Sequence, residues 1–499
     1  MTEHLLAIDA GTTGVTALLF DSNLEPVARA YAEFPQSFPE PGRVEHDARD
    51  ILAAVDRTVG ELAGHPSFDE VVAVGVTNQR ETVFALERST GRALAPGIVW
   101  QDRRTEPDCR ALEAAGHLAT IRARTGLVLD PYFSATKIAW MLRENARVRE
   151  AHARDEVVFV TVDTLVIAHL LGSGVADDER YVTDATNASR TMLFDIQDRA
   201  WSAELCELFG VKPDALARVE PSVAEFGVTD PARTGGRALS IRGVAGDQQA
   251  ALFGQGGFRP GVAKATFGTG SFLLFPTFEK RVDSAGGLLT TLAAGERGQP
   301  IFALEGSTFV CGALVQWLRD ELGFFDSSRE VEALAASVDD AAGVTIVPAF
   351  TGLGAPYWDA NARGAILGLT RGTSRAHIAR AALEAIALQN AELLELLREE
   401  SNGELGDLRV DGGAAANDLL MQLVADFGGA RVVRSADVEA TARGAALLAG
   451  VGAGLWSSPS EPAAMSGARV AFEARYDAMR RSAELARWRA AVTRVLTTA

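Results

Sequence analysis

Strand-like and helix-like patterns of apolar residues alternate along this chain of 499 residues. The first segment has an apolar stretch at Leu5–Ile8, a turn of glycine and hydroxyl residues, and a second apolar stretch at Val15–Phe20. This order predicts a β-hairpin with a polar, glycine-rich tip. Apolar residues then recur at helical spacing across Asp47–Leu62, where Asp47 is the expected N-cap. The alternation indicates an α/β protein.

The later apolar segments continue this rhythm and indicate two domains. Further strands are predicted at Pro26–Phe34, Val71–Val76, Thr82–Leu86, Ile98–Trp100, Val157–Val162, Leu408–Asp411 and Arg431–Arg434, and further helices at Arg103–Ala115, Ala135–Arg147, Asn417–Phe427 and Glu439–Gly450. Proline, glycine and threonine interrupt the pattern at 221–242, so we expect a boundary just beyond Asp247, with domains at 1–251 and 252–499. The second domain opens as the first does, with a Gly-Thr-Gly tip at 268–270 between two apolar stretches, which indicates one supersecondary unit used twice.

Composition and charge exclude several classes of protein. Hydrophobic residues make up 47% of the chain and charged residues 23%, a globular composition that excludes a disordered or fibrous chain. A net charge of −18 would repel nucleic acid and anionic lipid on average. The three cysteines, Cys109, Cys206 and Cys311, lack metal-site spacing and fit a reducing compartment. Since we find neither an apolar stretch of roughly 20 residues nor the pattern of a signal or transit peptide, we expect a cytoplasmic protein without a membrane-inserted segment.

The tip of the first hairpin, Asp9-Ala10-Gly11-Thr12-Thr13-Gly14, has the chemistry of a phosphate-binding turn. Its backbone N–H groups and threonine hydroxyls can hold phosphate oxygens, and Asp9 at the strand end can orient a magnesium ion through water. A solvated hairpin with an Asx turn is the alternative. The tip at 268–270 offers the same donors, whereas the turn at 411–417 lacks GxGxxG spacing and no GxxxxGK[ST] string is present. Dinucleotide-binding and P-loop folds are therefore disfavoured.

Asp247 follows a strand-like stretch and precedes an alanine-rich helix. A carboxylate at such a strand end can accept a proton from a hydroxyl group, although Asp is also a common helix cap. The adjacent charges of Arg80 and Glu81 could form a plain surface ion pair, and Trp100 and Tyr132 could simply pack in the core. The seven histidines show neither metal spacing nor a paired nucleophile, so metal chemistry beyond magnesium is not expected.

A series of short motifs from residue 5 to about 450 resembles the glycerol kinases of the FGGY carbohydrate kinase family. In chain order they are PGRVEHD (41–47), VTNQRET (76–82), IVWQDRRT (98–105), TGLVLDPYFSATK (125–137), TVDT (161–164), TNASRTMLF (186–194), GDQQAALFGQ (246–255), FGTGSF (267–272), ALEG (303–306), VPAFTGLGAPYWD (347–359), RGAILGLTRG (363–372) and VDGGAAAN (410–417). Because they keep their order over most of the chain, the resemblance is specific.

The resemblance implies an α/β fold of two actin-like, ribonuclease-H-type domains with a ligand cleft between them, and ATP-dependent phosphorylation of glycerol to sn-glycerol 3-phosphate. Domain 1–251 would bind glycerol and phosphate, and domain 252–499 the nucleotide. The glycerol-binding residues implied are Arg80, Glu81, Trp100, Tyr132, Asp247, Gln248 and Phe272, with Asp247 as the general base. The nucleotide-binding residues implied are Thr12, Thr13, Gly14, Thr16, Thr269, Gly312, Gln316, Gly413 and Asn417. Asp9 and Asp247 would lie near Mg²⁺, and the protein would form a homo-oligomer.

One departure concerns the first tip, where Thr16 replaces an arginine that many bacterial members carry near the nucleotide phosphates. Either another cation takes its place or the nucleotide binds differently, because stabilising the charge on the transferring phosphoryl group contributes strongly to catalysis. Two other functions fit the fold: phosphorylation of another polyol or sugar, such as erythritol or xylulose, and ATP hydrolysis without transfer.

Overall fold

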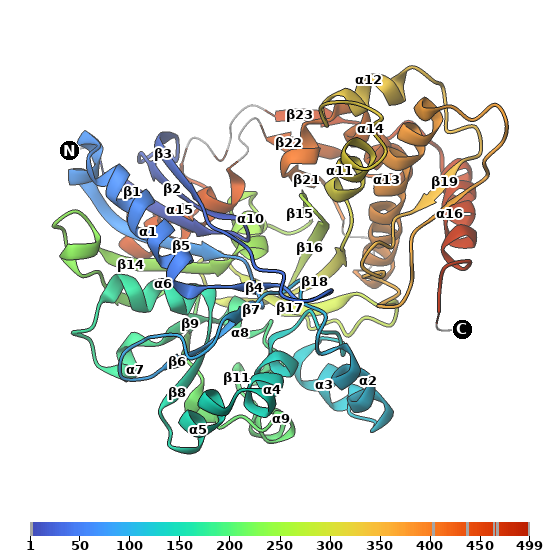
Figure 1. Ribbon diagram of the computed structural model, residues 1–499. Helices are drawn as coiled ribbons and strands as arrows, with labels where there is room; N and C mark the ends of the chain where they lie inside the picture. Colours follow the sequence, from blue (N-terminus) through green and yellow to red (C-terminus); the bar gives the residue numbers. More distant parts are fainter. Residues whose placement is uncertain (1–2, 402–404, 436–438, 463–464, 466–468, 498–499) are drawn as a thin grey trace. The chain divides into compact units, whose positions relative to one another are not determined.

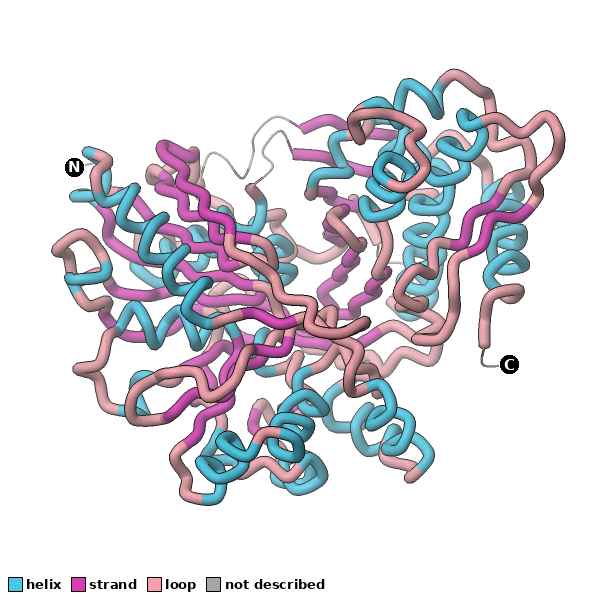
Figure 2. Tube along the Cα trace, in the orientation of Figure 1, coloured by secondary structure: helices cyan, strands magenta, loops and turns pink. Residues whose placement is uncertain are grey.

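The computed structural model describes residues 3–401, 405–435, 439–462, 465 and 469–497, and they form helices, strands and connecting loops throughout (Figures 1 and 2). The chain divides into two compact units, and each unit is discontinuous in sequence. The first comprises residues 1–258, 290–302 and 439–466, and the second comprises 259–289, 303–438 and 467–499. The point between residues 251 and 252, where we expect the domains to meet, falls inside helix α10 (Asp247–Gly254).

A six-stranded sheet forms the centre of the first unit, in the order β13-β14-β5-β1-β2-β3. Its strands are β1 (His4–Ala10), β2 (Gly14–Phe20), β3 (Pro26–Glu33), β5 (Val71–Asn78), β13 (Val223–Val228) and β14 (Ser240–Gly246). The predicted hairpin is confirmed, because β1 and β2 pair antiparallel. β5 pairs in parallel with both β1 and β14, so these three strands end at one edge of the sheet.

Helices cover both faces of this sheet. On one face, α1 (Ala48–Ala63) and α6 (Val162–Leu171) pack on residues such as Leu6 and Ile8. On the other, α15 (Ala440–Ala453) packs on residues such as Leu5 and Ala7. Alternate residues of β1 point to opposite faces, so burial of both sets explains why the strand is an almost unbroken apolar run. Helix α10 in turn packs on α15.

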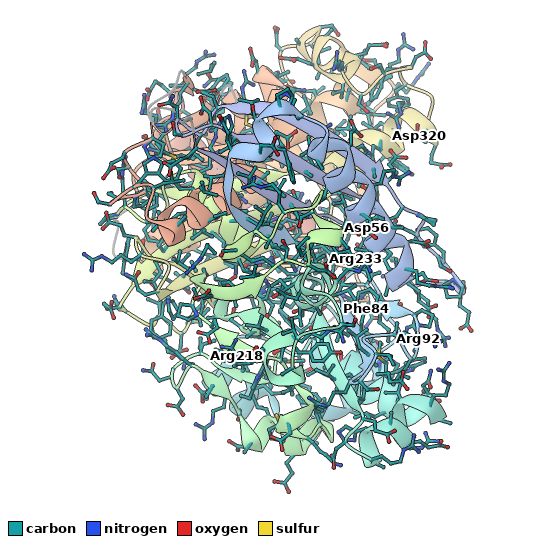
Figure 3. The ribbon with its side chains drawn as sticks, turned by 90° about the vertical axis from the view of Figure 1, so that its left-hand side faces the viewer. Asp56, Phe84, Arg92, Arg218, Arg233 and Asp320 are labelled. Atoms are coloured by element: carbon teal, nitrogen blue, oxygen red, sulfur yellow. The ribbon has the colours of Figure 1, made fainter. Side chains whose placement is uncertain are left out.

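Polar contacts at the rim hold α1 and α6 in place. Asp56 of α1 accepts at 2.7 Å from His169 of α6 and at 3.0 Å from Arg233. Asp56 and Arg233 lie next to each other in Figure 3. Arg233 belongs to the short helix η3 (Pro231–Arg233), so one carboxylate connects three segments.

The first unit contains a second sheet, in the order β4-β7-β6-β8, and several further helices. Its strands are β4 (Glu45–His46), β6 (Val83–Glu87), β7 (Gly97–Ile98) and β8 (Val157–Thr161), and the helices are α2 (Glu106–Ala114), α3 (Leu118–Thr125), α4 (Ser134–Glu144), α5 (Ala146–Ala153), α8 (Ala185–Ala188) and α9 (Ala203–Phe209). The helix expected at Ala135–Arg147 is interrupted. Asn145 is extended, with φ −107° and ψ 109°, and its side chain caps α5 by accepting from the backbone N–H of Val148. Capping is the usual role of Asn at such a position.

Short elements complete the first unit. They are η1 (Pro66–Glu70), α7 (Asp177–Arg180), β9 (Val182–Asp184), β10 (Phe194–Asp195), β11 (Ala200–Trp201), η2 (Pro213–Ala215), β12 (Arg218–Glu220) and β17 (Leu289–Ala294), whose first residue belongs to the second unit.

The second unit repeats the opening of the first. Hairpin β15 (Ala263–Phe267) and β16 (Ser271–Phe278) pairs in parallel with β21 (Leu408–Asp411) through β15, as β1 and β2 do with β5. The predicted reuse of one supersecondary unit is therefore present. The sheet has seven strands, in the order β17-β18-β16-β15-β21-β22-β23. Its further strands are β18 (Pro300–Thr308), whose first three residues belong to the first unit, β22 (Val432–Ser435) and β23 (Arg469–Phe472).

Helices surround this second sheet and build its core. They are α11 (Gly312–Asp320), α12 (Glu330–Ala336), α13 (Arg375–Glu400), η4 (Gly413–Ala416), α14 (Asp418–Gly428) and α16 (Ala478–Val492), beside the two-stranded pair β19 (Thr345–Val347) and β20 (Ala365–Leu367). α13 has 26 residues, and its apolar side chains pack with those of α14 and α16 in one cluster. In the part of the chain that the structure describes, we find no helix with the length and hydropathy needed to cross a bilayer.

Candidate active site

Three parallel strands of the first unit bring the predicted ligand-binding residues to one edge. Ala10, Asn78 and Gly246 stand side by side at the ends of β1, β5 and β14. The residues that directly follow these strands are the first hairpin tip, the Gln79–Thr82 segment, Asp247 and Gln248. In open α/β sheets, ligands bind at the carboxyl ends of the strands. This edge is therefore the candidate site of the first unit.

The hairpin tip is fixed by contacts from outside the hairpin. Gln79 Nε2 donates to the carbonyl of Gly11 at 2.9 Å, and Gln36 Nε2 donates to the carbonyl of Thr12 at 3.0 Å. Trp100 Nε1 donates to the Thr12 hydroxyl at 3.0 Å. Within the tip, the Gly11 N–H donates to the Gly14 carbonyl at 3.0 Å. The backbone N–H groups of Thr12 and Thr13 are therefore the donors that could face an anion.

His46 lies behind this tip, between the two glutamines. Its ring nitrogens are 3.4 Å from Gln79 Nε2 and 3.3 Å from Gln36 Nε2. Burial lowers the pKa of His46 to about 4, so the ring is neutral near pH 7. No role was expected for any histidine. The PGRVEHD motif contains His46, but the partners of this side chain lie 10 and 33 residues away, so only the fold reveals its role.

Asp9 is the last but one residue of β1, and its carboxyl group lacks a full set of partners. Its Oδ1 is buried and has no hydrogen-bond partner. Burial, and then the negative charges of Asp247 and Glu439, raise the pKa of Asp9 to about 8. An orphaned carboxylate oxygen beside two further carboxylates is a hard-oxygen environment that suits Mg²⁺. Among the described residues, no three Cys, His, Asp or Glu side chains form a metal cage, so water and phosphate oxygens would supply the other ligands.

Arg80 and Glu81 form a buried turn after β5, and the surface ion pair that we considered as an alternative is therefore wrong. Both side chains are 1% exposed. Arg80 donates to the hydroxyl of Tyr132 at 3.1 Å, and its Nε lies 3.5 Å from Asp247 Oδ1. Glu81 has a left-handed φ of 61° and accepts from Arg190 Nε at 2.7 Å. A non-glycine residue in this backbone region is typical of functional sites.

Trp100 and Tyr132 form an aromatic wall beside this turn. Their rings meet edge to face, with centroids 5.8 Å apart. Tyr132 is 2% exposed, and its backbone N–H donates to Asp130 Oδ1 at 2.8 Å. The apolar faces of two rings next to buried charges can bind the carbon chain of a small polar molecule. Tyr132 is buried and contacts Arg80, while Trp100 is half-buried and packs against Tyr132.

Asp247 is the most accessible charged group of this cluster. Its side chain is 30% exposed, in contrast to the 1% of Arg80. It occupies the first turn of α10, and its Oδ1 accepts from the backbone N–H of Gln248 at 2.7 Å. Gln248 is buried. A carboxylate that is held by Arg80 and still reaches solvent has the properties of a general base.

The short helix α8 supports two of the three strand ends. The Thr186 hydroxyl accepts from the backbone N–H of Gly246 at 3.0 Å, and the amides of Asn187 and Asn78 bond to each other at 3.0 and 3.1 Å. Asp184 caps the helix and accepts from both Thr186 and Asn187. The TNASRTMLF motif contains these residues, but only the fold reveals their role.

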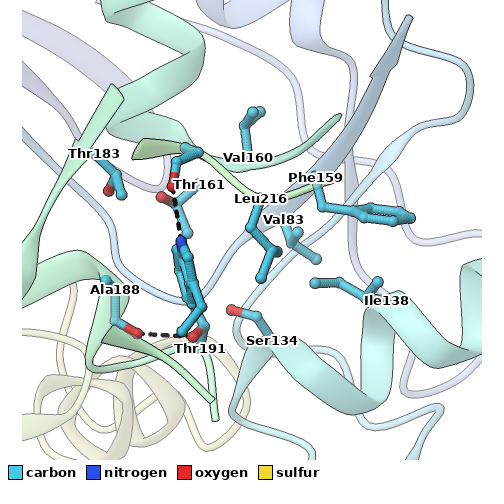
Figure 4. Close-up of a pocket in the computed structure, with 12 residues that line it drawn as sticks. Val83, Ser134, Ile138, Phe159, Val160, Thr161, Thr183, Ala188, Thr191 and Leu216 are labelled. Atoms are coloured by element: carbon cyan, nitrogen blue, oxygen red, sulfur yellow. Dashed lines mark hydrogen bonds between the residues drawn. The ribbon is translucent and has the colours of Figure 1, made fainter. Parts of the chain in front are cut away.

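A small cavity lies nearby, among β6, α4 and β8 (Figure 4). Its volume is about 20 Å³, which is enough for one water molecule and too little for a substrate. Ser134 lines it and donates to the carbonyl of Glu81 at 2.8 Å. Thr191, on the same wall, donates to the carbonyl of Ala188. Through Ser134, the cavity adjoins the Arg80–Glu81 turn.

The second unit contains a much larger cavity, with a volume of about 500 Å³. Five of the predicted nucleotide residues line it: Thr269, Gly312, Gln316, Gly413 and Asn417. Asn417 also caps α14 by accepting from the backbone N–H of Leu420 at 2.8 Å. A partly apolar cavity of this size fits an adenosine-sized ligand. Phe272 lies in this unit, on β16, and is 9% exposed.

The other predicted nucleotide residues lie in the first unit. Thr12 and Thr13 belong to the hairpin tip, and Gly14 begins β2. A side chain at Gly14 would approach the Tyr31 ring to 2.7 Å, so glycine is needed there. Thr16 stands opposite Asp9 on β1 and opposite Tyr31 on β3, so the departure at this position lies beside the candidate cation site.

Comparisons with known proteins give concordant results. The N-terminal domain model of the FGGY family of carbohydrate kinases matches residues 4–254, and its C-terminal domain model matches residues 263–453. A glycerol kinase of Aromatoleum aromaticum is 53% identical over 494 residues, which cover 98% of each chain. A glycerol kinase of Leptothrix cholodnii is 50% identical, again over 98% of each chain. The crystal structure of Plasmodium falciparum glycerol kinase with ADP superimposes with a TM-score of 0.90 at 33% identity, covering 100% of this chain and 99% of that one.

Proposed function

The chain belongs to the FGGY family of carbohydrate kinases, and from this membership we propose that it transfers the γ-phosphoryl group of ATP to a primary hydroxyl of glycerol. The products are sn-glycerol 3-phosphate and ADP. Relatives named glycerol kinase that match nearly the whole chain support the substrate pair, and the relative solved with ADP supports an adenine nucleotide.

The observation that carries the proposal is the buried polar cluster next to Asp247. Arg80, Glu81 and Tyr132 are desolvated and held by protein partners. A small triol presents three hydroxyl groups, and each needs a fixed hydrogen-bond partner in such a place. A substrate that lacks one hydroxyl would leave a buried polar group unpaired, which such a site penalises strongly.

In the proposed mechanism, Asp247 accepts the proton of the attacking hydroxyl. The oxygen of that hydroxyl forms a bond to the γ-phosphorus, and the bond from the γ-phosphorus to the bridging oxygen of ADP breaks. Arg80 orients the Asp247 carboxylate, with Nε 3.5 Å from Oδ1. Catalysis comes mainly from alignment and charge stabilisation, because the transition state is loose.

Asp9 and Asp247 would hold Mg²⁺, which supplies positive charge against the phosphate oxygens. Two observations support this assignment. Oδ1 of Asp9 has no hydrogen-bond partner, and the negative charges of Asp247 and Glu439 act on Asp9. The backbone N–H groups and hydroxyls of Thr12 and Thr13 would bind phosphate oxygens. The cavity of the second unit would hold the adenosine part of ATP.

The decisive experiment measures ADP release by the purified protein with MgATP and one polyol at a time. We expect release that depends on glycerol, with weak or no release on erythritol or xylulose. Coupling to a dehydrogenase specific for sn-glycerol 3-phosphate identifies the product. Stronger turnover of another polyol would replace glycerol as the substrate, and ATP hydrolysis with no phosphorylated polyol would overturn the kinase assignment.

We further propose that the protein acts in the cytoplasm, where ATP is available, and that it forms a homo-oligomer. Fractionation of the source cells tests the first proposal. Sedimentation of the purified protein tests the second, and a single species at the mass of one chain, 52.8 kDa, would contradict it.

A further inference from the structure

Lysine is rare in this protein, and one of its few lysines lies wholly inside the first unit. Only four of the 48 basic residues are lysines: Lys137, Lys212, Lys264 and Lys280. Lys137 is 0% exposed, in the first turns of α4. A chain that uses arginine almost everywhere else therefore keeps an ammonium group at a buried position.

The Lys137 ammonium group makes all of its hydrogen bonds to one short stretch of backbone. Nζ donates to the carbonyls of Pro131, Tyr132 and Phe133, at 2.6, 2.7 and 3.3 Å. Three N–H donors in a compact, tetrahedral arrangement can serve three converging carbonyls. The planar guanidinium of arginine cannot reproduce that geometry.

This placement is unfavourable for stability, so another advantage must explain it. Removing a cation from water is costly, and the N-terminal end of a helix carries positive partial charge that repels it. No carboxylate of the described residues lies within ion-pair distance of Nζ. Asp102, Glu81 and Asp130 act on it only through space. The three carbonyls are therefore its direct compensation.

The clamped backbone carries the aromatic wall of the candidate site. Tyr132 lies within it, bonded through its hydroxyl to Arg80 and through its backbone N–H to Asp130. Lys137 fixes the carbonyl side of the same residue, while Asp130 fixes the amide side. We propose that Lys137 is a positioning residue that sets Tyr132 for substrate binding. This inference rests on the proposed function.

The test compares variants that remove donors stepwise. Lys137→Gln keeps two N–H donors, Lys137→Met keeps none at similar length, and Lys137→Arg keeps charge with the wrong geometry. We expect KM for glycerol to rise in the order Gln, then Met, by about tenfold or more for Met, because misplacement of a binding group has effects of this size. KM for ATP should change little. Arginine should not restore the wild-type value.

A matched control is Lys264→Met, which alters the other fully buried lysine, on β15 of the second unit. It should lower the melting temperature without raising KM for glycerol. If Lys137 served folding alone, Lys137→Met would likewise lower the melting temperature without raising KM for glycerol. If Lys137→Met does not fold, Lys137→Gln provides the comparison.

A double-mutant cycle with Tyr132→Phe tests whether Lys137 acts through Tyr132. If Lys137 acts through Tyr132, Lys137→Gln should raise KM for glycerol less in the Tyr132→Phe background than in the wild type. Additive effects, or folded Lys137 variants whose KM for glycerol stays within about twofold of wild type, would overturn the inference. Absence of glycerol phosphorylation by the wild-type protein would overturn the proposed function instead, so the two failures are distinguishable.

Discussion

Asp9 and Asp247 stand at the ends of parallel strands in the same sheet, yet their carboxyl groups have different surroundings. Asp9 has a buried oxygen with no partner, whereas Asp247 is 30% exposed and is held by Arg80 and by the N–H of Gln248. A buried carboxyl oxygen that lacks a partner, close to two other acids, stays protonated until a bound cation favours its ionised form. An accessible, oriented carboxylate is suited to accepting a proton. Two predictions separate these roles.

Asp247→Asn should lower turnover by about 10²-fold or more, because the amide cannot accept the hydroxyl proton. The melting temperature should change little, since the side chain reaches solvent. Steady-state kinetics with glycerol and MgATP measures the effect. Asp50→Asn, which removes an acid from the first turn of α1 away from the site, is the control and should keep full turnover. Near-normal turnover in Asp247→Asn would exclude Asp247 as the base.

Asp9→Asn should make the ligand-free protein more stable near pH 8 while abolishing efficient turnover. The pKa of Asp9 is about 8 in the folded protein, against 3.8 as the ordinary value. Between these pH values the folded state retains a proton that the unfolded chain has lost, so stability falls as pH rises, by about 1.4 kcal/mol per pH unit. Asp9→Asn has no titrating group at position 9, so its stability does not fall with pH in this way.

Thermal melting of both proteins from pH 5 to pH 9, without Mg²⁺ or nucleotide, measures the difference. The melting curves should diverge up to pH 8 and run parallel above it. A constant difference across the whole range would mean that Asp9 is ionised throughout, contrary to the pKa given above.

At this scale, sequence reasoning located the residues that meet ligands better than those that hold them. Asp9 and Asp247 lie at strand ends, and that position made them candidates, whereas the roles of Arg80 and Glu81 came only from the family resemblance. Thr186 and His46 gave no such signal, because their partners, Gly246 and Gln79, lie 60 and 33 residues away along the chain. Only folding brings such groups together.

At the level of elements, α10 is fixed by its close crossing with α15. A Cβ added at Gly444 of α15 would lie 1.8 Å from the carbonyl oxygen of Ala250 in α10. Asp247 begins α10, so the same crossing determines where this carboxylate stands. A displaced α10 would move it relative to Arg80.

Gly444→Ala should therefore destabilise the protein by about 3 kcal/mol, the upper range for overpacking, and lower turnover in the molecules that fold. The matched control is Gly60→Ala in α1, where nothing lies within 4 Å of the added Cβ. That change should stabilise the protein by roughly 0.5–1 kcal/mol, because alanine favours helix. Urea denaturation measures the free energy of unfolding of both variants. Equal effects of the two changes would show that the crossing tolerates a methyl group.

Local pattern predicted the strands and the hairpin tips well, since each depends on a short run of residues. It did not predict the break at Asn145, where a polar side chain ends one helix and caps the next. It also left out α13, although apolar residues recur along its 26 positions. Because α13 is buried on many sides, its apolar residues do not form a single clear stripe. The sequence pattern of such a helix is hard to tell from that of other buried segments.

At the scale of the whole molecule, the first unit depends on a distant part of the sequence. Helix α15 covers one face of its sheet, where Leu5, Ala7, Leu18 and Phe20 are buried. A chain that stops at residue 258 would leave this face uncovered. Exposed apolar patches of that kind promote aggregation.

A fragment of residues 1–258 should therefore aggregate and bind a hydrophobic dye. A matched fragment, in which a flexible linker joins 439–466 to the same residues, should be more soluble and bind less dye. Sedimentation and dye fluorescence compare the two. Equal behaviour would mean that α15 contributes little to covering the sheet.

The late position of α15 also has a consequence for biosynthesis. The ribosome makes β1 first and reaches α15 about 430 residues later, which takes roughly 20 to 90 s at usual elongation rates. During that interval the nascent first unit has one sheet face without its helix. We expect the emerging chain to need a chaperone that shields this face until translation is nearly complete.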